Sequence, residues 1–471
     1  MPAAHRTHRL RPLLGVLGFA AALSGCPKAP PSPAAASVAV DIPFEKYELN
    51  NGLDVILSED HSVPFVWVEV WYQVGSKDER AGLTGFAHLF EHLMFQGSEH
   101  MNDDYFVPLQ KIGAEINGTT NTDRTNYFEG VPSEQLPLAL WLEADRMGWL
   151  LPALTPEKLQ NQKDVVRNER RQRYENRPYG QVGVWRSAAL FPEGHPYHIP
   201  TIGKHEDIEN AKMEDVHAFF KTWYVPNGAS LVIVGDFDPA EAKALVEKYF
   251  GPIPRGADPT PVTKAPAALS ESKTLHYESR VPDHKVSLSW LTPPLFAEGD
   301  AALDFCSSVL TGSADSRLYQ ALVQQQGIAK DVVAYQGSAR LQSTYVIEAT
   351  AAPGHSTDEL VAAIDVVLAD LRTKPIDEAE LAGIRTGWEI AFYGSLQSIQ
   401  GKAGSLSSYN SLLGQPGGIG KDLARYQALT PADIQAAFAG PLSGPRVTLH
   451  VHPLGEAPAG SILDNTVQAR P

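Results

Sequence analysis

Two histidines and a glutamate stand one helical turn apart in the apolar stretch Leu83–Gly97: His88, Glu91 and His92. This stretch contains no proline and is bounded by glycines, which predicts a short buried helix. Residues three and four positions apart share a helix face, so we expect the three side chains to point the same way. Two neutral imidazoles can hold one Zn²⁺, while a carboxylate beside them takes a proton from a metal-activated water. This is a chemistry of peptide hydrolysis.

The pattern H-x-x-E-H also fits a less specific alternative, in which the two histidines and the glutamate lie on a solvated helix face. The neighbouring residues argue against it, because Leu89–Phe90 and Leu93–Phe95 leave little room for such a face. Burying three ionisable groups without a metal or ion partner is unfavourable. We therefore predict a zinc site in which Glu91 acts as the general base.

A catalytic zinc site needs a third protein ligand and an open position. Glu157, Glu169 and Glu175 all lie in or beside one strongly helical run, and composition alone does not choose among them. The context V-V-R-N-E-R-R around Glu169, 77 positions after His92, resembles the pitrilysin/insulinase family of inverzincin zinc metallopeptidases. This resemblance implies that Glu169 completes the zinc site with His88 and His92.

A second segment carries the same resemblance. Asn117–Tyr127 reads N-G-T-T-N-T-D-R-T-N-Y and is similar to the family pattern N-A-x-T-x-x-D-x-T-x-Y, with a glycine in place of alanine. In the family, this strand lies beside the zinc and its exposed edge pairs with the substrate main chain. The resemblance implies substrate binding by Asn117, Gly118, Thr119 and Thr120, and the glycine predicts a looser edge. The alternative is a hairpin whose threonines simply favour strand.

The body of the chain predicts two α+β halves, because strand and helix patterns mix without a strict βαβ alternation. We predict an N-terminal catalytic zinc half at 42–255, a Pro/Ala-rich linker at 256–272 and a C-terminal non-catalytic half at 273–471. The second half repeats the order of elements but contains no second H-x-x-E-H. The family resemblance implies mostly antiparallel sheets covered by helices, with the halves forming a clamshell around a peptide cleft.

The N-terminus predicts a targeting segment, since a basic region precedes the apolar run 13–23, which is too short to span a bilayer securely. The run ends in L-S-G-Cys26, which resembles a bacterial lipoprotein cleavage box. An ordinary secretory signal and an uncleaved anchor are the alternatives. The resemblance implies removal of residues 1–25, a lipidated Cys26 that anchors the chain, and, with Pro27 following, an outer-membrane location facing the periplasm. Residues 26–41 then form a flexible tether.

Composition narrows the remaining possibilities. The formal charge of -16 argues against nucleic acid or an anionic membrane surface as a partner. With Cys26 lipidated, no intrachain disulfide remains, and Cys306 is predicted to be a small buried hydrophobe. His195 and His198 lie in a proline- and glycine-rich segment, and we predict that they are surface residues of a structural loop. The other histidines are scattered without ligand spacing.

One departure from the family bears on activity. The segment Ser316–Lys330 resembles the family's S-R-L-Y-x-x-L-R-x-x-x-G-L-A-Y, whose later arginine and tyrosine hold the substrate carbonyl and the developing oxyanion across the cleft. In this chain those two places are Val323 and Lys330. Neither can play the same part, because valine has no donor and lysine is a flexible point charge.

Two functional hypotheses follow. In the first, the chain is a zinc endopeptidase that cleaves peptides or unfolded segments, and a related second subunit or a second copy supplies the missing arginine and tyrosine. In the second, the chain is a lipid-anchored, zinc-containing peptide-binding or assembly subunit without proteolytic activity of its own. We favour the enzyme because the ligands and the base are all retained, which a binding role does not require.

Overall fold

The computed structural model of the chain describes residues 41–260, 262–263 and 266–468. The predicted signal segment and Cys26 lie outside these residues. Within the described ranges, no helix combines the length and the apolar character needed to cross a bilayer.

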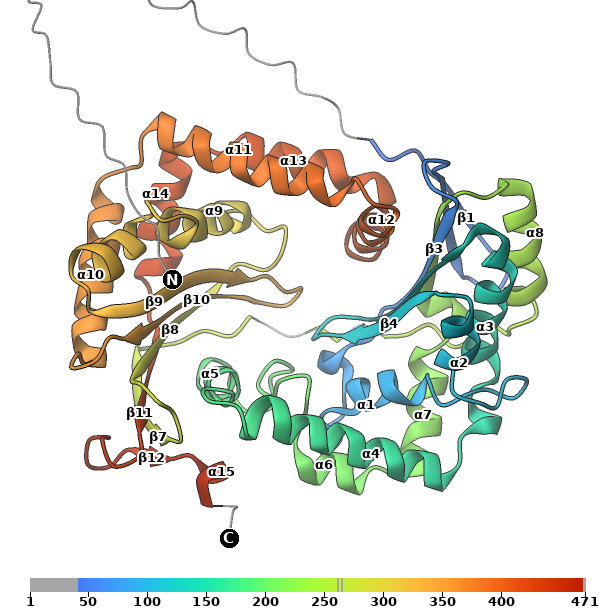
Figure 1. Cartoon of the computed structure of the whole chain (residues 1–471), viewed down its shortest axis with the longest axis horizontal. Coiled ribbons are helices and arrows are strands. Elements are labelled where there is room, and N and C mark those ends of the chain that lie inside the picture. Colours follow the sequence, from blue (N-terminus) through green and yellow to red (C-terminus); the bar gives the residue numbers. More distant parts are fainter. Residues whose placement is uncertain (1–40, 261, 264–265, 469–471) are drawn as a thin grey trace, which may run out of the picture. The chain divides into compact units, whose positions relative to one another are not determined.

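Two six-stranded sheets organise the described chain (Figure 1). The first contains β1 (Glu45–Glu48), β2 (Asp54–Glu59), β3 (Phe65–Tyr72), β4 (Glu115–Thr120), β5 (Thr125–Pro132) and β6 (Ala229–Gly235). The second contains β7 (Lys273–Ser279), β8 (Lys285–Thr292), β9 (Ala329–Gly337), β10 (Ser343–Ala351), β11 (Val447–Pro453) and β12 (Ile462–Leu463). Their spatial orders are β1-β2-β6-β3-β5-β4 and β12-β7-β11-β8-β10-β9. Each sheet is mostly antiparallel, with parallel pairing at β2–β6 in the first and at β7–β11 and β7–β12 in the second.

The helices divide between the same two halves. Those that follow strands of the first sheet are α1 (Phe86–Leu93), α2 (Phe106–Lys111), α3 (Leu136–Trp149), α4 (Pro156–Arg170), α5 (Val182–Leu190), α6 (His205–Asn210), α7 (Met213–Trp223) and α8 (Pro239–Phe250). Those of the second half are α9 (Asp300–Thr311), α10 (Thr357–Thr373), α11 (Glu378–Ser395), α12 (Ile399–Leu413), α13 (Ile419–Gln427), α14 (Pro431–Ala439) and α15 (Asn465–Gln468). The predicted α+β class with two sheet-and-helix halves is confirmed.

The local sequence explains the main elements. The Asn51-Gly52 turn joins β1 to β2, and Gly52 adopts the positive φ of 88° that such hairpin turns require. β6 is buried at every position and lies between β2 and β3, which matches its continuous apolar run. α10 begins with a capping box, in which Ser356 and Glu359 each accept a hydrogen bond from the backbone N–H of the other residue.

Each sheet buries one face against helices of its own half and part of the other face against one helix of the opposite half. On the first sheet, the second face packs on α12, through Trp67, Val232, Val234, Ala403, Leu406 and Tyr409. On the second sheet, it packs on α5, through Val447, Leu449, Val451, Val182, Ala189 and Leu190. The Trp185 ring of α5 also stacks on Tyr277 of β7 with centroids 4.0 Å apart. Each half therefore contributes a helix that packs against the sheet of the other half.

Candidate metal centre

Helix α1 begins at a tightly constrained turn. Gly85 has a φ of 84°, and a Cβ there would lie 2.7 Å from the Ile202 carbonyl oxygen, so the glycine is required. The Glu79 carboxylate accepts hydrogen bonds from the backbone N–H groups of Gly85 (2.9 Å) and Ala87 (2.8 Å). These bonds satisfy donors that a helix N-terminus otherwise leaves open. Burial raises the pKa of Glu79 to about 8, although the same N–H groups oppose this rise.

The apolar face of α1 fixes the direction of its polar face. Phe90 is fully buried and its ring packs against Tyr224 and the α7 residues Phe219 and Phe220, with centroids 4.5, 5.5 and 6.0 Å away. Aromatic packing of this kind leaves few alternative rotations of the helix. The polar residues of α1 are therefore held on the opposite side, toward α4.

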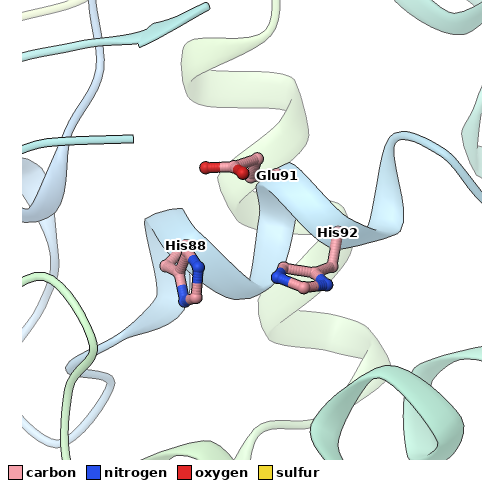
Figure 2. A group of neighbouring side chains, drawn as sticks. All are labelled: His88, Glu91 and His92. Carbon is pink, nitrogen blue, oxygen red and sulfur yellow. The ribbon is translucent and has the colours of Figure 1, made fainter. Parts of the chain in front are cut away.

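The three motif residues lie close together on α1 (Figure 2). One ligand-type atom from each of His88, Glu91 and His92 lies within 4.8 Å of the others. The two imidazole rings are 4.9 Å apart between centroids and nearly perpendicular. His88 is buried, whereas Glu91 and His92 are half-buried.

The Glu169 carboxylate of α4 reaches the same point. Its Oε2 lies 3.7 Å from Nε2 of His88 and 3.3 Å from Nε2 of His92. Its Oε1 is 2.6 Å from the Arg173 guanidinium, which belongs to the π-helical turn Arg171–Glu175 that ends α4. One carboxylate oxygen is thus held by an arginine and the other faces both imidazoles.

The two other glutamates that composition left open lie elsewhere. Glu157 is exposed in the first turn of α4. Glu175 pairs with the imidazole of His205 at 2.7 Å and with Arg170 at 3.2 Å. Of these three glutamates, Glu169 is the one whose carboxylate the structure places beside His88 and His92.

The electrostatics of this group favour the protonation states that bind metal. Burial lowers the pKa of His88 to about 4, and the neighbouring His92 adds to this effect. Burial alone would raise the pKa of Glu169, but its hydrogen bond with His92 and the charges of His88 and Arg173 together lower it. Burial raises the pKa of Glu91, while the Thr120 hydroxyl opposes the rise. At neutral pH, His88 therefore offers a free lone pair and Glu169 a negative charge.

The donor set fits a zinc ion. Two imidazole nitrogens and one carboxylate oxygen are ligands of catalytic zinc sites with an open fourth position. Among the described residues, Oε2 of Glu91 is buried and has no hydrogen-bond partner, so one carboxylate oxygen beside this group has nothing to bind. Such a group is unfavourable unless water, metal or substrate completes it.

The predicted substrate strand is β4, which lies at the edge of the first sheet and pairs with β5. Asn117 and Gly118 lie opposite Phe128 and Tyr127 in an antiparallel pairing of the two strands. A Cβ at Gly118 would lie 3.0 Å from the Tyr127 ring and 3.2 Å from the Phe95 ring. The glycine therefore has a steric reason, and the predicted looser edge stays a prediction.

Arg124 and Arg173 are two residues beside this site that the sequence did not single out. The Arg124 guanidinium donates to the Thr119 carbonyl oxygen at 2.7 Å, and its positive charge opposes the raised pKa of Glu91. No local signal marks that role, because it depends on the β4–β5 turn. Arg173 could have been found from its position four residues after Glu169, a spacing that pairs opposite charges on a helix.

Comparison with known proteins places this geometry in a family. The family description "Insulinase (Peptidase family M16)" matches residues 54–190, and "Peptidase M16 inactive domain" matches residues 210–387. An uncharacterized zinc protease of Mycobacterium leprae is 30% identical over 335 residues, which cover 70% of this chain and 74% of that protein. The chain belongs to peptidase family M16.

Other M16 relatives and structures agree. The zinc protease PqqE of Helicobacter pylori is 28% identical over 372 residues, covering 78% of this chain and 83% of PqqE. A crystal structure of a protease from Helicobacter pylori superposes with a TM-score of 0.82 at 26% identity, covering 88% of this chain and all of that chain. The pitrilysin/insulinase resemblance of the sequence is confirmed at the level of the family and the fold.

Val323 and Lys330, the two places where this chain departs from the M16 pattern, both have partners in the second half. Lys330 is the second residue of β9, after Ala329, and its Nζ lies 2.6 Å from the Asp283 carboxylate. Val323 is partly buried against the apolar core of the second half. Both residues lie in the region that matches the M16 inactive domain. Their side chains already have partners in the second half, because Lys330 pairs with Asp283 and Val323 packs against the apolar core.

The structure also bears on predictions for residues outside the motif, and it corrects the one for His195. His195 was predicted to be a surface residue, but it is buried, with its ring stacked on Phe191 at 4.7 Å. Neighbouring apolar residues of the same segment, such as Phe191, cover the His195 imidazole. His198 is half-buried, and its Nδ1 lies 2.8 Å from the Phe191 carbonyl oxygen. The prediction that Cys306 is buried is confirmed.

Proposed function

We propose that this M16 chain is a zinc-dependent endopeptidase that hydrolyses peptides or unfolded protein segments. The observation that supports it best is the convergence of His88, His92 and Glu169. Oε2 of Glu169 lies 3.7 Å from Nε2 of His88 and 3.3 Å from Nε2 of His92, and Glu91 lies beside them. When bound to these three residues, zinc would polarise the attacking water and the scissile carbonyl. The relatives described as zinc proteases support the same chemistry.

The side chains have distinct parts in this proposal. Glu91 takes a proton from the attacking water and delivers it to the leaving amine. Its burial and raised pKa suit a group that must bind and release a proton within one reaction cycle. The edge of β4, at Asn117, Gly118, Thr119 and Thr120, pairs with the main chain of an extended substrate.

The oxyanion donors come from a second chain in this proposal. Val323 has no polar atom in its side chain, and the Lys330 ammonium is paired with Asp283 within its own half. A related subunit, or a second copy of this chain, would bring an arginine and a tyrosine to the substrate carbonyl. Co-purification, followed by cleavage assays with and without the captured chain, tests this point.

A second candidate function rests on the same two residues. A chain without its own oxyanion donors could bind peptides or assemble with a partner without cleaving them. Metal analysis combined with peptide cleavage separates the two functions. Bound zinc without turnover, both alone and with the partner, would favour the binding role.

The decisive experiment replaces Glu91 by Gln. With the captured second chain present in the assay, we expect the Glu91→Gln chain to keep its zinc and to lose cleavage of an unfolded casein substrate by at least about 100-fold, because the proton acceptor is gone. Glu157→Gln, an exposed change in α4, is the matched control and should cleave like the unchanged chain. Cleavage by Glu91→Gln at the control rate would exclude Glu91 as the base.

We also propose that the chain is a lipoprotein of the cell envelope, anchored through Cys26 and facing the periplasm of an outer membrane. The support is the sequence alone, namely the basic and apolar N-terminal segment that ends in L-S-G-C. Labelling with a fatty-acid analogue tests it. We expect label on the unchanged chain and none on Cys26→Ala.

A further inference from the structure

Four histidines that are far apart in the sequence meet on the second sheet. His276 of β7 lies opposite His450 of β11 in the parallel register, and His452 follows two residues later on the same face. His284, just before β8, reaches the same place. His450 and His452 are buried, whereas His276 and His284 are half-buried. We call His276, His284, His450 and His452 the histidine cluster.

The ring nitrogens of the cluster face one another. Nδ1 of His276 lies 3.1 Å from Nε2 of His452, and Nδ1 of His284 lies 3.1 Å from Nδ1 of the same His452 ring. The rings of His276 and His450 stack with centroids 4.4 Å apart. Both nitrogens of His452 are thus engaged by other imidazoles.

A carboxylate lies beside the cluster. The Glu456 carboxylate is 3.1 Å from Nε2 of His284. With the ring proton of His284 on Nε2, its Nδ1 can accept from the Nδ1–H tautomer of His452. In that pair of tautomers, Nε2 of His452 carries the lone pair and lies 3.1 Å from Nδ1 of His276.

The surroundings of His450 and His452 favour the neutral, metal-binding forms of these two imidazoles. Burial lowers the pKa of His450 to about 4, and burial followed by the neighbouring His284 lowers that of His452. Glu278 and Asp358 oppose the shift of His452. Nδ1 of His450 lies 2.7 Å from the Thr357 hydroxyl in the first turn of α10, so His450 has a partner outside the cluster.

We propose that the histidine cluster is a second metal site, which binds a late first-row divalent ion such as zinc through Nδ1 of His276 and Nε2 of His452. The 3.1 Å separation of these nitrogens is close to the roughly 3.3 Å between two imidazole nitrogens about 2.0–2.1 Å from one tetrahedral zinc. Water completes the coordination, because His276 is half-buried and reachable from solvent.

Next to the proposed ligand His452, His284 and Glu456 form a chain of polar contacts. A metal-bound histidine commonly donates its other ring N–H to an acceptor, which fixes the tautomer and the orientation of the ring. Here Nδ1 of His452 lies 3.1 Å from Nδ1 of His284, and Nε2 of His284 lies 3.1 Å from the Glu456 carboxylate, so such a chain of donors can form behind a bound metal. His284 is therefore a positioning residue, and His276 is the ligand whose loss should matter most.

The test uses the full chain, purified without a histidine tag, with His88→Ala and His92→Ala removing the first centre. We expect this double variant still to bind one Co²⁺ per chain, with the visible absorption of a low-symmetry site. Adding His276→Gln should weaken Co²⁺ binding by more than about 100-fold, and adding His284→Gln by about 10-fold to 100-fold. His61→Gln, an exposed histidine next to Asp236, is the matched control and should change nothing.

Folding is checked separately by circular dichroism, and both test positions are half-buried, so they disturb the core less than His452 would. If the double variant binds no more Co²⁺ than its His276→Gln derivative, the cluster is a hydrogen-bonded chain of imidazoles and the metal site is refuted. That result would leave the proposed peptidase function intact, because the test omits the first centre.

Discussion

The two sheets of this M16 chain share one layer plan but carry different chemistry on their faces. Beside the first sheet, α1 presents His88 and His92 one turn apart, with the Glu169 carboxylate of α4 within 3.7 Å. On the second sheet, the histidines stand on the strands themselves, and the nearest carboxylate, Glu456, faces His284. The first arrangement has two imidazoles and a carboxylate at one point, whereas the second has pairs of imidazoles.

The faces covered by the opposite half differ as well. Under α5, Glu348 of the second sheet meets the Arg186 guanidinium at 2.8 Å. On the face of the first sheet that α12 covers, the buried Glu69 accepts a hydrogen bond from the neutral Asn126 amide. A glutamate with a cation keeps its charge at little expense, while one with a neutral partner is pushed toward its protonated form. The two covered faces therefore give their glutamates different partners, a guanidinium for Glu348 and an amide for Glu69.

The largest effect that would sharpen this comparison is loss of the carboxylate ligand of the first centre. Glu169→Gln should reduce zinc affinity at that centre by more than about 100-fold, because removing a ligand exceeds the 10-fold to 100-fold effect of outer-shell changes. Competition with a chelating dye measures it. Glu175→Gln, whose side chain pairs with His205 instead, is the control and should change affinity little.

Equal zinc affinity in Glu169→Gln and the unchanged chain would break the comparison, because the Glu169 carboxylate would then not be a ligand of the first centre. Glu91, which is also within 4.8 Å of both imidazoles, would become the better third ligand.

The sequence predicted the first centre because its parts are local. His88, Glu91 and His92 obey the helical period, and that period survives any tertiary arrangement. Glu169 was reached only through the family resemblance, since a spacing of 77 residues has no physical meaning until α4 is packed on α1. The roles of these residues remain predictions, while their proximity is an observation.

The second half shows why the rest could not be predicted. His276 and His452 are 176 positions apart, and the register of β7 against β11 alone brings them together. α12 is rich in glycine and serine, residues that disfavour helix interiors. Its sequence therefore does not predict the helix that covers the first sheet. Packing against Trp67 and Val232 overrides that local preference.

The second prediction concerns the pH dependence that Glu69 creates. Burial raises the pKa of Glu69 from 4.5 to about 7, so the folded chain holds this proton over a range in which the unfolded chain has lost it. Stability should therefore fall as pH rises from about 4.5 to 7 and level off above that. The shift corresponds to roughly 3 kcal/mol at most. The difference in unfolding free energy between Glu69→Gln and the unchanged chain, measured by denaturant titration, should grow by up to that amount.

Glu348→Gln is the matched control for that pH series, because Glu348 has the Arg186 partner that Glu69 lacks. We expect no growing advantage of Glu348→Gln over the unchanged chain between pH 4.5 and 7. Parallel curves for Glu69→Gln and the unchanged chain would mean that Glu69 is ionised when folded, and the two covered faces would then be alike.

The smallest expected effect tests how firmly α1 is held. Glu79→Ala removes the acceptor for the backbone N–H groups of Gly85 and Ala87, and should lower the free energy of unfolding by about 1–2 kcal/mol. Glu79→Gln keeps an acceptor oxygen and should lose less, while Glu193→Ala, in an exposed loop, should be neutral. If Glu79→Ala is as stable as Glu193→Ala, the aromatic packing of Phe90 alone orients the helix. The first centre would then be oriented by packed side chains, whereas backbone register brings the strand-borne histidines together.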